Sequence, residues 1–339
     1  MEFGLDTFGD VTRDAQGTLL PQDQVLRHVI DEAVLADQVG VDAINLGEHH
    51  RDDFAISAPE ILLANIAART SRIRLGTAVT VLSTDDPIRL YQRFSTLNAI
   101  SGGRGEIILG RGSFVESYPL FGHDLSEYEM LFEEKLALFV AVNKGGAVSW
   151  QGRHRAPVAV PAVYPPAGPG GIHTWVGVGG SPESVVRAVR HDLPMMLAII
   201  GGDPRRFLPF VRLYHDAAAK MGKAVQPLGV HSPGLIAATD AEAREAAFTG
   251  YKALHDRIGR ERGWPPITRD AFLAEVEGGS QYVGSPETVA RKIADTIRDL
   301  GLQRFSLKYS AGTTAHETLM RSVELYGTRV IPLVREMLG

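Results

Sequence analysis

Short apolar segments alternate with longer amphipathic ones along nearly the whole chain, and this alternation restricts the fold more than any other feature. We expect strands over residues 2–6, 43–46, 73–81, 106–109, 174–178, 195–200, 229–237 and 305–308. We expect helices over residues 22–39, 59–69, 88–100, 128–142, 182–190, 207–221, 241–262, 286–300 and 318–338, the last with a kink or break at Pro332. Strands that alternate with helices pair in parallel through right-handed crossovers, which predicts an α/β fold.

The number of strand–helix units favours a closed barrel. Eight units in 339 residues match the (β/α)8 TIM barrel, a fold of roughly 250 residues or more. We predict one domain over residues 1–339, with insertions at about residues 145–171 and 263–281. In the first insertion, residues 150–154 indicate a turn between short strands, and the second is rich in turn residues. An open doubly wound sheet is the alternative.

Charge and cysteine content exclude several classes of protein. The chain has 35 basic and 40 acidic residues, so its formal net charge of −5 argues against a nucleic-acid or anionic-membrane partner. It has no cysteine, which excludes disulfides, thiolate nucleophiles and cysteine-ligated metal centres. The N-terminus does not resemble a signal peptide, and the longest apolar run, residues 195–200, is shorter than the roughly 18 residues of a spanning helix. We therefore expect a cytoplasmic protein.

Histidines follow the second expected strand, at the end of a barrel where active sites lie. His49 and His50 are adjacent, and neighbouring side chains of an extended segment point to opposite sides, so the pair does not easily share one metal ion. Metal-binding spacings such as HExxH are absent, and we predict no metal site. One histidine can serve as an acid, a base or a hydrogen-bond donor; alternatively, both are structural.

Two segments have the chemistry of an anion site. Arg111 lies between Gly110 and Gly112 after the fourth strand, where its guanidinium can bind a phosphate or simply belong to a surface turn. After the fifth strand, Gly179 and Gly180 precede Ser181, a good N-cap, and the free N–H groups of such a helix start attract anions. A similar cap at residues 284–288 shows that capping alone does not identify a phosphate site.

The order and spacing of the motifs resemble the bacterial luciferase-like family of flavin-dependent monooxygenases. The resemblance rests on Met1-Glu2-Phe3-Gly4, Leu46-Gly47-Glu48-His49-His50, Gly76-Thr77-Ala78-Val79, Gly102-Gly103-Arg104, Arg111-Gly112 and His191-Asp192-Leu193-Pro194. It implies a (β/α)8 barrel that binds reduced FMN (FMNH2), supplied by a separate flavin reductase. The flavin and O2 would oxidise a small-molecule substrate, and the chain would form a homodimer.

The resemblance also implies roles for individual residues. Arg111 matches the arginine that binds the FMN phosphate, and the phosphate site is completed by Gly179, Gly180, Ser181 and Ser184. Ala78 and Val79 match the pair beside the isoalloxazine ring, which is often joined by a non-prolyl cis peptide. His49 matches the active-site histidine, which is proposed to assist proton transfer.

Two departures from the luciferase pattern put light emission in doubt. Gly110 stands where luciferase has a reactive cysteine, and Gly180 replaces an acidic residue of the phosphate loop. An F420-dependent oxidoreductase of the same superfamily and a non-catalytic flavin-binding subunit are the alternatives to a monooxygenase. A barrel hydrolase that uses Glu48, His49 and a metal ion is a third alternative, and the sequence does not offer the second cluster of metal ligands that it would need.

Overall fold

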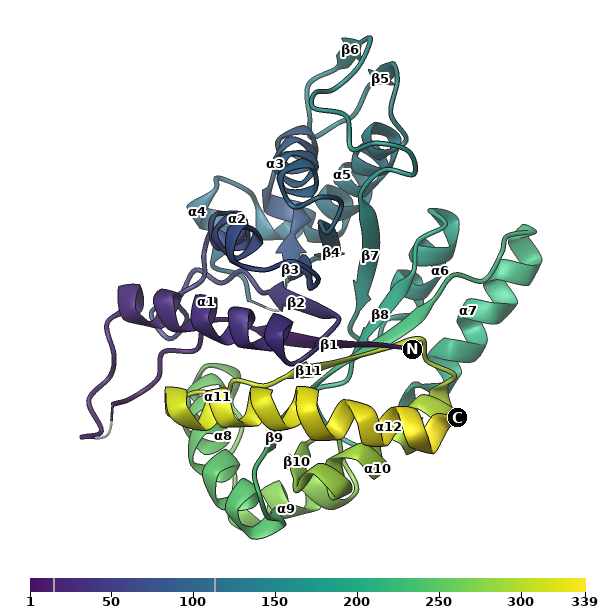
Figure 1. The fold of residues 1–339 in the computed structure, drawn as a ribbon. Helices are drawn as coiled ribbons and strands as arrows, with labels where there is room; N and C mark the ends of the chain where they lie inside the picture. The colour runs from purple at the N-terminus through teal and green to yellow at the C-terminus, as the bar shows by residue number, and fades with distance from the viewer. Residues whose placement is uncertain (15, 113) are drawn as a thin grey trace.

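A closed ring of parallel strands forms the centre of the protein (Figure 1). The computed structural model describes residues 1–14, 16–112 and 114–339. The ring contains β1 (Glu2–Thr7), β2 (Ala43–Leu46), β3 (Arg74–Val81), β4 (Glu106–Gly110), β7 (His173–Val178), β8 (Met195–Ala198), β9 (Leu228–Ile236) and β11 (Arg304–Lys308). Pairing of β1 with β11 and of β8 with β9 completes the ring. The (β/α)8 TIM barrel is therefore confirmed and the open sheet is wrong.

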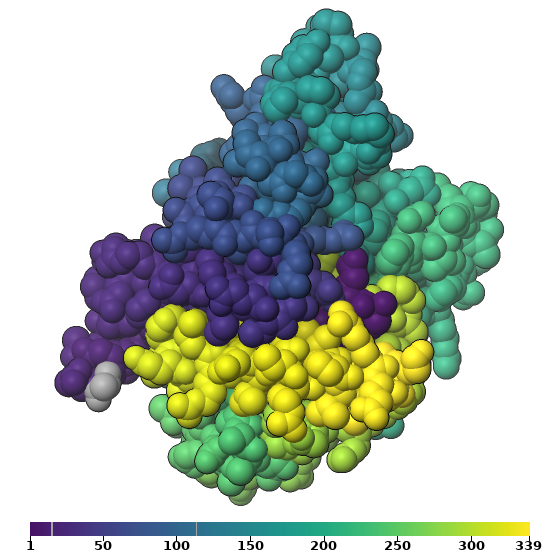
Figure 2. All heavy atoms as spheres, viewed as in Figure 1, coloured from purple at the N-terminus to yellow at the C-terminus, as the bar shows by residue number. Residues whose placement is uncertain are grey.

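Helices surround the ring, and their ends lie within two residues of the predicted ones. They are α1 (Gln22–Gln38), α2 (Pro59–Arg69), α3 (Pro87–Ile100), α5 (Tyr128–Asn143), α6 (Pro182–Arg190), α7 (Leu208–Met221), α8 (Asp240–Arg262), α10 (Pro286–Leu300), α11 (His316–Leu325) and α12 (Ile331–Leu338). The first and last helical segments pack side by side because β1 and β11 are neighbours (Figure 2). Both faces of the barrel strands are buried: in β4, Ile107 and Leu109 belong to the main apolar core, whereas Ile108 belongs to a separate small cluster with Ala78, Trp175 and Met196.

The two insertions differ from each other. The first forms an antiparallel hairpin, β5 (Val148–Trp150) and β6 (Val158–Val160), which confirms the predicted turn and extends away from the barrel in Figure 1. The second contains a helix that we did not predict, α9 (Arg269–Glu277), followed by the short strand β10 (Tyr282–Gly284) beside β9. This helix forms because the Thr268 hydroxyl caps its start, accepting from the Ala271 N–H at 3.2 Å, and because its apolar side chains pack into the core.

The last helical segment is interrupted just before the expected proline. A π-helical turn, Tyr326–Val330, joins α11 to α12, and Pro332 lies in the first turn of α12. A proline is tolerated there because the first N–H groups of a helix have no intrahelical partner.

An ion pair occupies the amino end of the barrel. Arg304 donates from Nη1 and Nη2 to the carboxylate of Glu106 at 2.9 and 2.6 Å, and neither side chain is exposed. Burial alone would raise the pKa of Glu106, but Arg304 and His173 outweigh burial and lower that pKa to about 2. Residues at this end of a TIM barrel serve stability, and the opposite end is left for chemistry.

Candidate active site

The predicted site residues share one mouth of the barrel. His49 follows β2, Arg111 follows β4 and Ser181 follows β7. Because the barrel strands are parallel, their carboxyl ends open on the same face, which is where barrel enzymes bind their ligands.

The Ala78–Val79 peptide bond in β3 is cis, as predicted. The Val79 side chain lies over glycines of β4 and β7. A Cβ atom on Gly110 would lie 2.7 Å from Val79 Cγ2, and one on Gly177 would lie 3.1 Å from Val79 Cγ1. Close packing against Val79 therefore explains the glycine at position 110, where the resemblance to luciferase would predict a cysteine.

The residues predicted to bind an anion come together at the start of α6. Arg111 donates from Nη2 to the Ser184 hydroxyl at 3.3 Å, and the hydroxyls of Ser181 and Ser184 are 2.7 Å apart. The Ser181 hydroxyl also accepts from the Ser184 N–H at 3.3 Å, so Ser181 is the predicted N-cap. No atom outside its chain neighbours lies within 4 Å of a Cβ atom placed on Gly179, and Gly180 has a φ of +114° that favours glycine. Room and donors for an anion therefore occur together.

A second arginine in this cluster escaped sequence reasoning. Arg187 donates from Nη1 to the Ser184 hydroxyl at 3.3 Å, from Nη2 to Glu129 at 3.0 Å and from Nε to Glu133 at 2.5 Å. Its side chain is only 6% exposed. The available signal was its spacing, three residues after Ser184 on the same helix face. Glu129 also forms an ion pair with Arg111, so one carboxylate joins both arginines.

His49 lies among aromatic rings. The centroid of its ring is 4.7 Å from that of Phe8, 4.5 Å from that of Phe54 and 5.0 Å from that of Phe114. Burial lowers the pKa of His49 to about 3, so its imidazole is neutral near pH 7. Its Nε2 atom is buried, and no described group bonds to it. His49 can therefore exchange a hydrogen bond with a ligand, but it is a poor source of a proton.

His50 has different surroundings, as predicted for adjacent histidines. Its Nε2 atom is 2.9 Å from Glu48 Oε1, and its ring packs edge-on against Phe121. Among the residues that the structure describes, no group of three or more acidic or imidazole side chains is arranged to hold a metal ion.

A second histidine of the barrel interior was also missed. His231 Nδ1 lies 2.6 Å from Asp6 Oδ2, and Asn45 donates to Asp6 Oδ1 at 2.7 Å. The ring of Phe8 stacks on His231 with a centroid distance of 6.0 Å and contacts His49 with its edge. These contacts join β1, β2 and β9, which are far apart in sequence, so no local sequence pattern predicts them.

Arg51 closes one side of the mouth. It bonds to Asp53 at 2.9 Å, to Glu116 at 2.7 Å and to Glu261 of α8 at 2.6 Å. We call Arg51 with these three carboxylates the Arg51 clamp. The guanidinium also lies 4.6 Å from the ring centroid of Phe114, which in turn contacts His49. The Arg51 clamp thus holds α8 beside the aromatic surroundings of His49.

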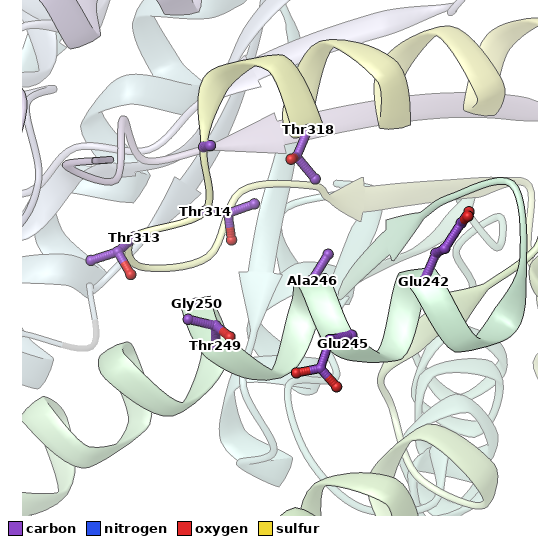
Figure 3. Close-up of a pocket in the computed structure, with 9 residues that line it drawn as sticks. Glu242, Glu245, Ala246, Thr249, Gly250, Thr313, Thr314 and Thr318 are labelled. Atoms are coloured by element: carbon purple, nitrogen blue, oxygen red, sulfur yellow. The ribbon is translucent and has the colours of Figure 1, made fainter. Parts of the chain in front are cut away.

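A separate groove of about 470 Å³ lies between α8 and the segment that follows β11 (Figure 3). Its lining consists of Glu242, Glu245, Ala246, Thr249, Gly250, Thr313, Thr314, Ala315 and Thr318. None of the predicted site residues and no basic side chain is among these lining residues, so the groove does not suit a phosphate.

No helix in the described ranges is both long and apolar enough to cross a membrane.

Comparisons with known proteins agree with this architecture. The chain is 22% identical over 356 residues to an alkanal monooxygenase alpha chain of Photorhabdus luminescens, with 97% of each chain covered. Its fold matches the oxygenating constituent of 3,6-diketocamphane monooxygenase from Pseudomonas putida in complex with FMN, with a TM-score of 0.81, 21% identity and 98% of each chain covered.

A coenzyme F420-dependent tetrahydromethanopterin reductase of Methanopyrus kandleri shares the fold as well, with a TM-score of 0.70, 18% identity and 98% of each chain covered. At these identities the two structures show the fold and not the cofactor. A family model described as luciferase-like monooxygenase matches residues 1–304. The chain therefore belongs to the luciferase-like monooxygenase family.

Proposed function

We propose that this protein is a flavin-dependent monooxygenase that uses reduced FMN and O2 to oxidise a small organic substrate. The observation that carries the proposal is the cluster of Arg111, Ser181 and Ser184 at the start of α6, on the same mouth as His49 and the Ala78–Val79 peptide. An arginine fork, two hydroxyls and a helix N-terminus together fit a phosphate monoester. Bound reduced FMN would supply the electrons that activate O2.

The residues of the mouth have distinct roles in this proposal. Arg111, Ser181 and Ser184 would hold the phosphate, with the backbone of Gly179 and Gly180 leaving room for it. Ala78 and Val79 would lie beside the isoalloxazine ring of the flavin. His49, neutral near pH 7, offers a hydrogen bond from its unpartnered Nε2 side. Phe8, Phe54 and Phe114 keep water away from that imidazole.

The proposal includes partners. A separate flavin reductase would deliver the reduced cofactor, and two copies of the chain would form a homodimer in the cytoplasm. The whole chain would act as one domain, because residues from β2 to α6 contribute to a single mouth.

The phosphate assignment is tested by comparing FMN with riboflavin, which lacks the phosphate. We expect Arg111→Met to weaken FMN binding about tenfold to a hundredfold, because a hydrogen bond to a charged group contributes roughly 1.5 to 3 kcal/mol. Riboflavin affinity should not change, and the exposed Arg27→Met serves as the control. Quenching of flavin fluorescence measures both affinities. Unchanged FMN affinity in Arg111→Met would make the assignment wrong.

An F420-dependent oxidoreductase is the second candidate, because a reductase that uses this coenzyme shares the fold. The two functions differ in their use of oxygen. Supplying each reduced cofactor in turn and following O2 consumption separates them. Substrate-dependent O2 uptake with reduced FMN, above the uptake by free reduced FMN, supports the monooxygenase, whereas oxidation of reduced F420 without uptake supports the alternative.

A further inference from the structure

Arg111, Ser181, Ser184 and Arg187 form a cluster that we call the anion pocket. A carboxylate already occupies the space between its two arginines. Glu129, in the first turn of α5, forms an ion pair with Arg111 through Oε1 and lies 3.0 Å from Arg187 Nη2 through Oε2. Both arginines also donate to the Ser184 hydroxyl. Two carboxylate oxygens therefore meet the same donors that would meet two oxygens of a phosphate.

Glu129 is free to leave this position. Its side chain is 58% exposed, whereas those of Arg111 and Arg187 are 20% and 6% exposed. A rotation of Glu129 toward solvent vacates no packed site in the core. An ion pair with so exposed a partner is also weak, because water solvates the released carboxylate.

Both arginines keep their places without Glu129. Arg187 remains bonded to Glu133 at 2.5 Å and lies over the Phe132 ring at 5.2 Å. Arg111 remains over the Tyr128 ring at 4.9 Å, and the Tyr128 hydroxyl donates to the Gly112 carbonyl at 3.3 Å. Departure of Glu129 therefore leaves two oriented guanidinium groups that face Ser184.

We propose that Arg187 is a second phosphate-binding cation and that Glu129 is a built-in competitor, which a phosphate monoester must displace to bind. The inference rests on the proposed function only for the identity of the phosphate carrier, FMN. A phosphate carries a larger charge and more acceptor oxygens than a carboxylate, so it displaces the Glu129 carboxylate from the two arginines. Glu133 positions Arg187, and Glu129 competes for it. A flavin without a phosphate has no group to exchange with Glu129.

The test removes the competing charge. We expect Glu129→Gln to bind FMN roughly threefold to tenfold more tightly than the wild type, because FMN no longer has to break the weak ion pairs of Glu129 with the two arginines. Riboflavin affinity should not change. Glu127→Gln is the matched control, because that carboxylate lies two residues away and faces Arg153 and His154 instead. Arg187→Met should weaken FMN binding at least tenfold and leave riboflavin binding unchanged.

Inorganic phosphate serves as a second probe, independent of flavin. Its affinity, measured by displacement of FMN or by ³¹P NMR, should also rise in Glu129→Gln and fall in Arg187→Met. If the wild type binds no FMN but phosphate follows this pattern, the proposed function fails and the competitor stands. If Glu129→Gln leaves phosphate and FMN affinities unchanged or weaker, Glu129 is not a competitor. Wild-type affinities in Arg187→Met would exclude Arg187 as a ligand.

Discussion

Arg304→Met should destabilise the barrel strongly because it leaves a carboxylate buried without its partner. Glu106 accepts two hydrogen bonds from Arg304 at 2.6 and 2.9 Å, and both side chains are fully buried. Removing one member of such a pair costs about 3 to 5 kcal/mol. Unfolding entropy of about 2.1 cal/mol/K per residue over 339 residues gives about 0.7 kcal/mol/K, so the melting temperature should fall by roughly 4 to 7 °C.

The pH dependence separates the lost charge from the lost volume. In the wild type the pKa of Glu106 is lowered to about 2, so its contribution to stability is present above pH 4.5 and is lost as the pH falls toward 2. Without Arg304, only His173 remains of the two groups that lower the pKa of Glu106, so burial shifts this pKa upward and protonation relieves the poorly compensated charge. The deficit of Arg304→Met relative to the wild type should therefore be smaller at pH 4 than at pH 7.

Differential scanning fluorimetry at both pH values measures the effect. Glu106→Gln/Arg304→Met is the control, because it removes both charges and should recover most of the lost stability. FMN affinity of the folded variants should be unchanged, since the pair lies at the amino end of the barrel. The reasoning is refuted if the double variant is as unstable as Arg304→Met, or if the deficit does not depend on pH.

Two further predictions concern the mouth of the barrel. Burial lowers the pKa of His49 to about 3, whereas an unfolded histidine has a pKa of about 6.5. Because the unfolded chain takes up this proton first, the free energy of unfolding of the wild type should fall by about 2 kcal/mol between pH 7 and pH 5 through this residue. His49→Gln should lack that fall, and an equal pH dependence of both proteins in unfolding experiments would contradict the assignment. Gly47→Ala should lower the free energy of unfolding by about 1 to 3 kcal/mol, because its Cβ would lie 2.2 Å from Phe8 and 2.7 Å from the Ala78 carbonyl oxygen. Gly179→Ala is the control, since its Cβ meets open space and the unfolding midpoint should not change. Similar losses of stability in both variants would show that packing is not the cause.

Periodicity predicted the barrel because each strand–helix unit has its own local pattern. The eight strands and their helices follow from apolar spacing, and Ser181 was identifiable as an N-cap from its own segment. Helix α9 was missed because its turn-rich surroundings obscured a short helix, whose stability comes from tertiary packing of Phe272 and Val276.

The contacts within the site were less accessible to sequence reasoning. Arg187 and Glu129 are 58 positions apart, and Asp6 and His231 are 225 apart, so it is the order of the strands in the barrel that brings each pair together. The environment that makes His49 neutral likewise comes from Phe8, Phe54 and Phe114, which lie on three different segments. Sequence motifs thus indicated groups capable of the chemistry, and the fold decided their protonation and partners.

The Arg51 clamp takes Glu116 from the stretch that follows β4 and Glu261 from α8. Arg111, Glu129, Ser184 and Arg187 all lie between β4 and the end of α6, so α8 supplies a residue to the clamp and none to this cluster. Substitutions in α8 can therefore change the surroundings of His49 while Arg111, Ser184 and Arg187 stay the same. Among related chains, the opening beside His49 can thus vary independently of that cluster.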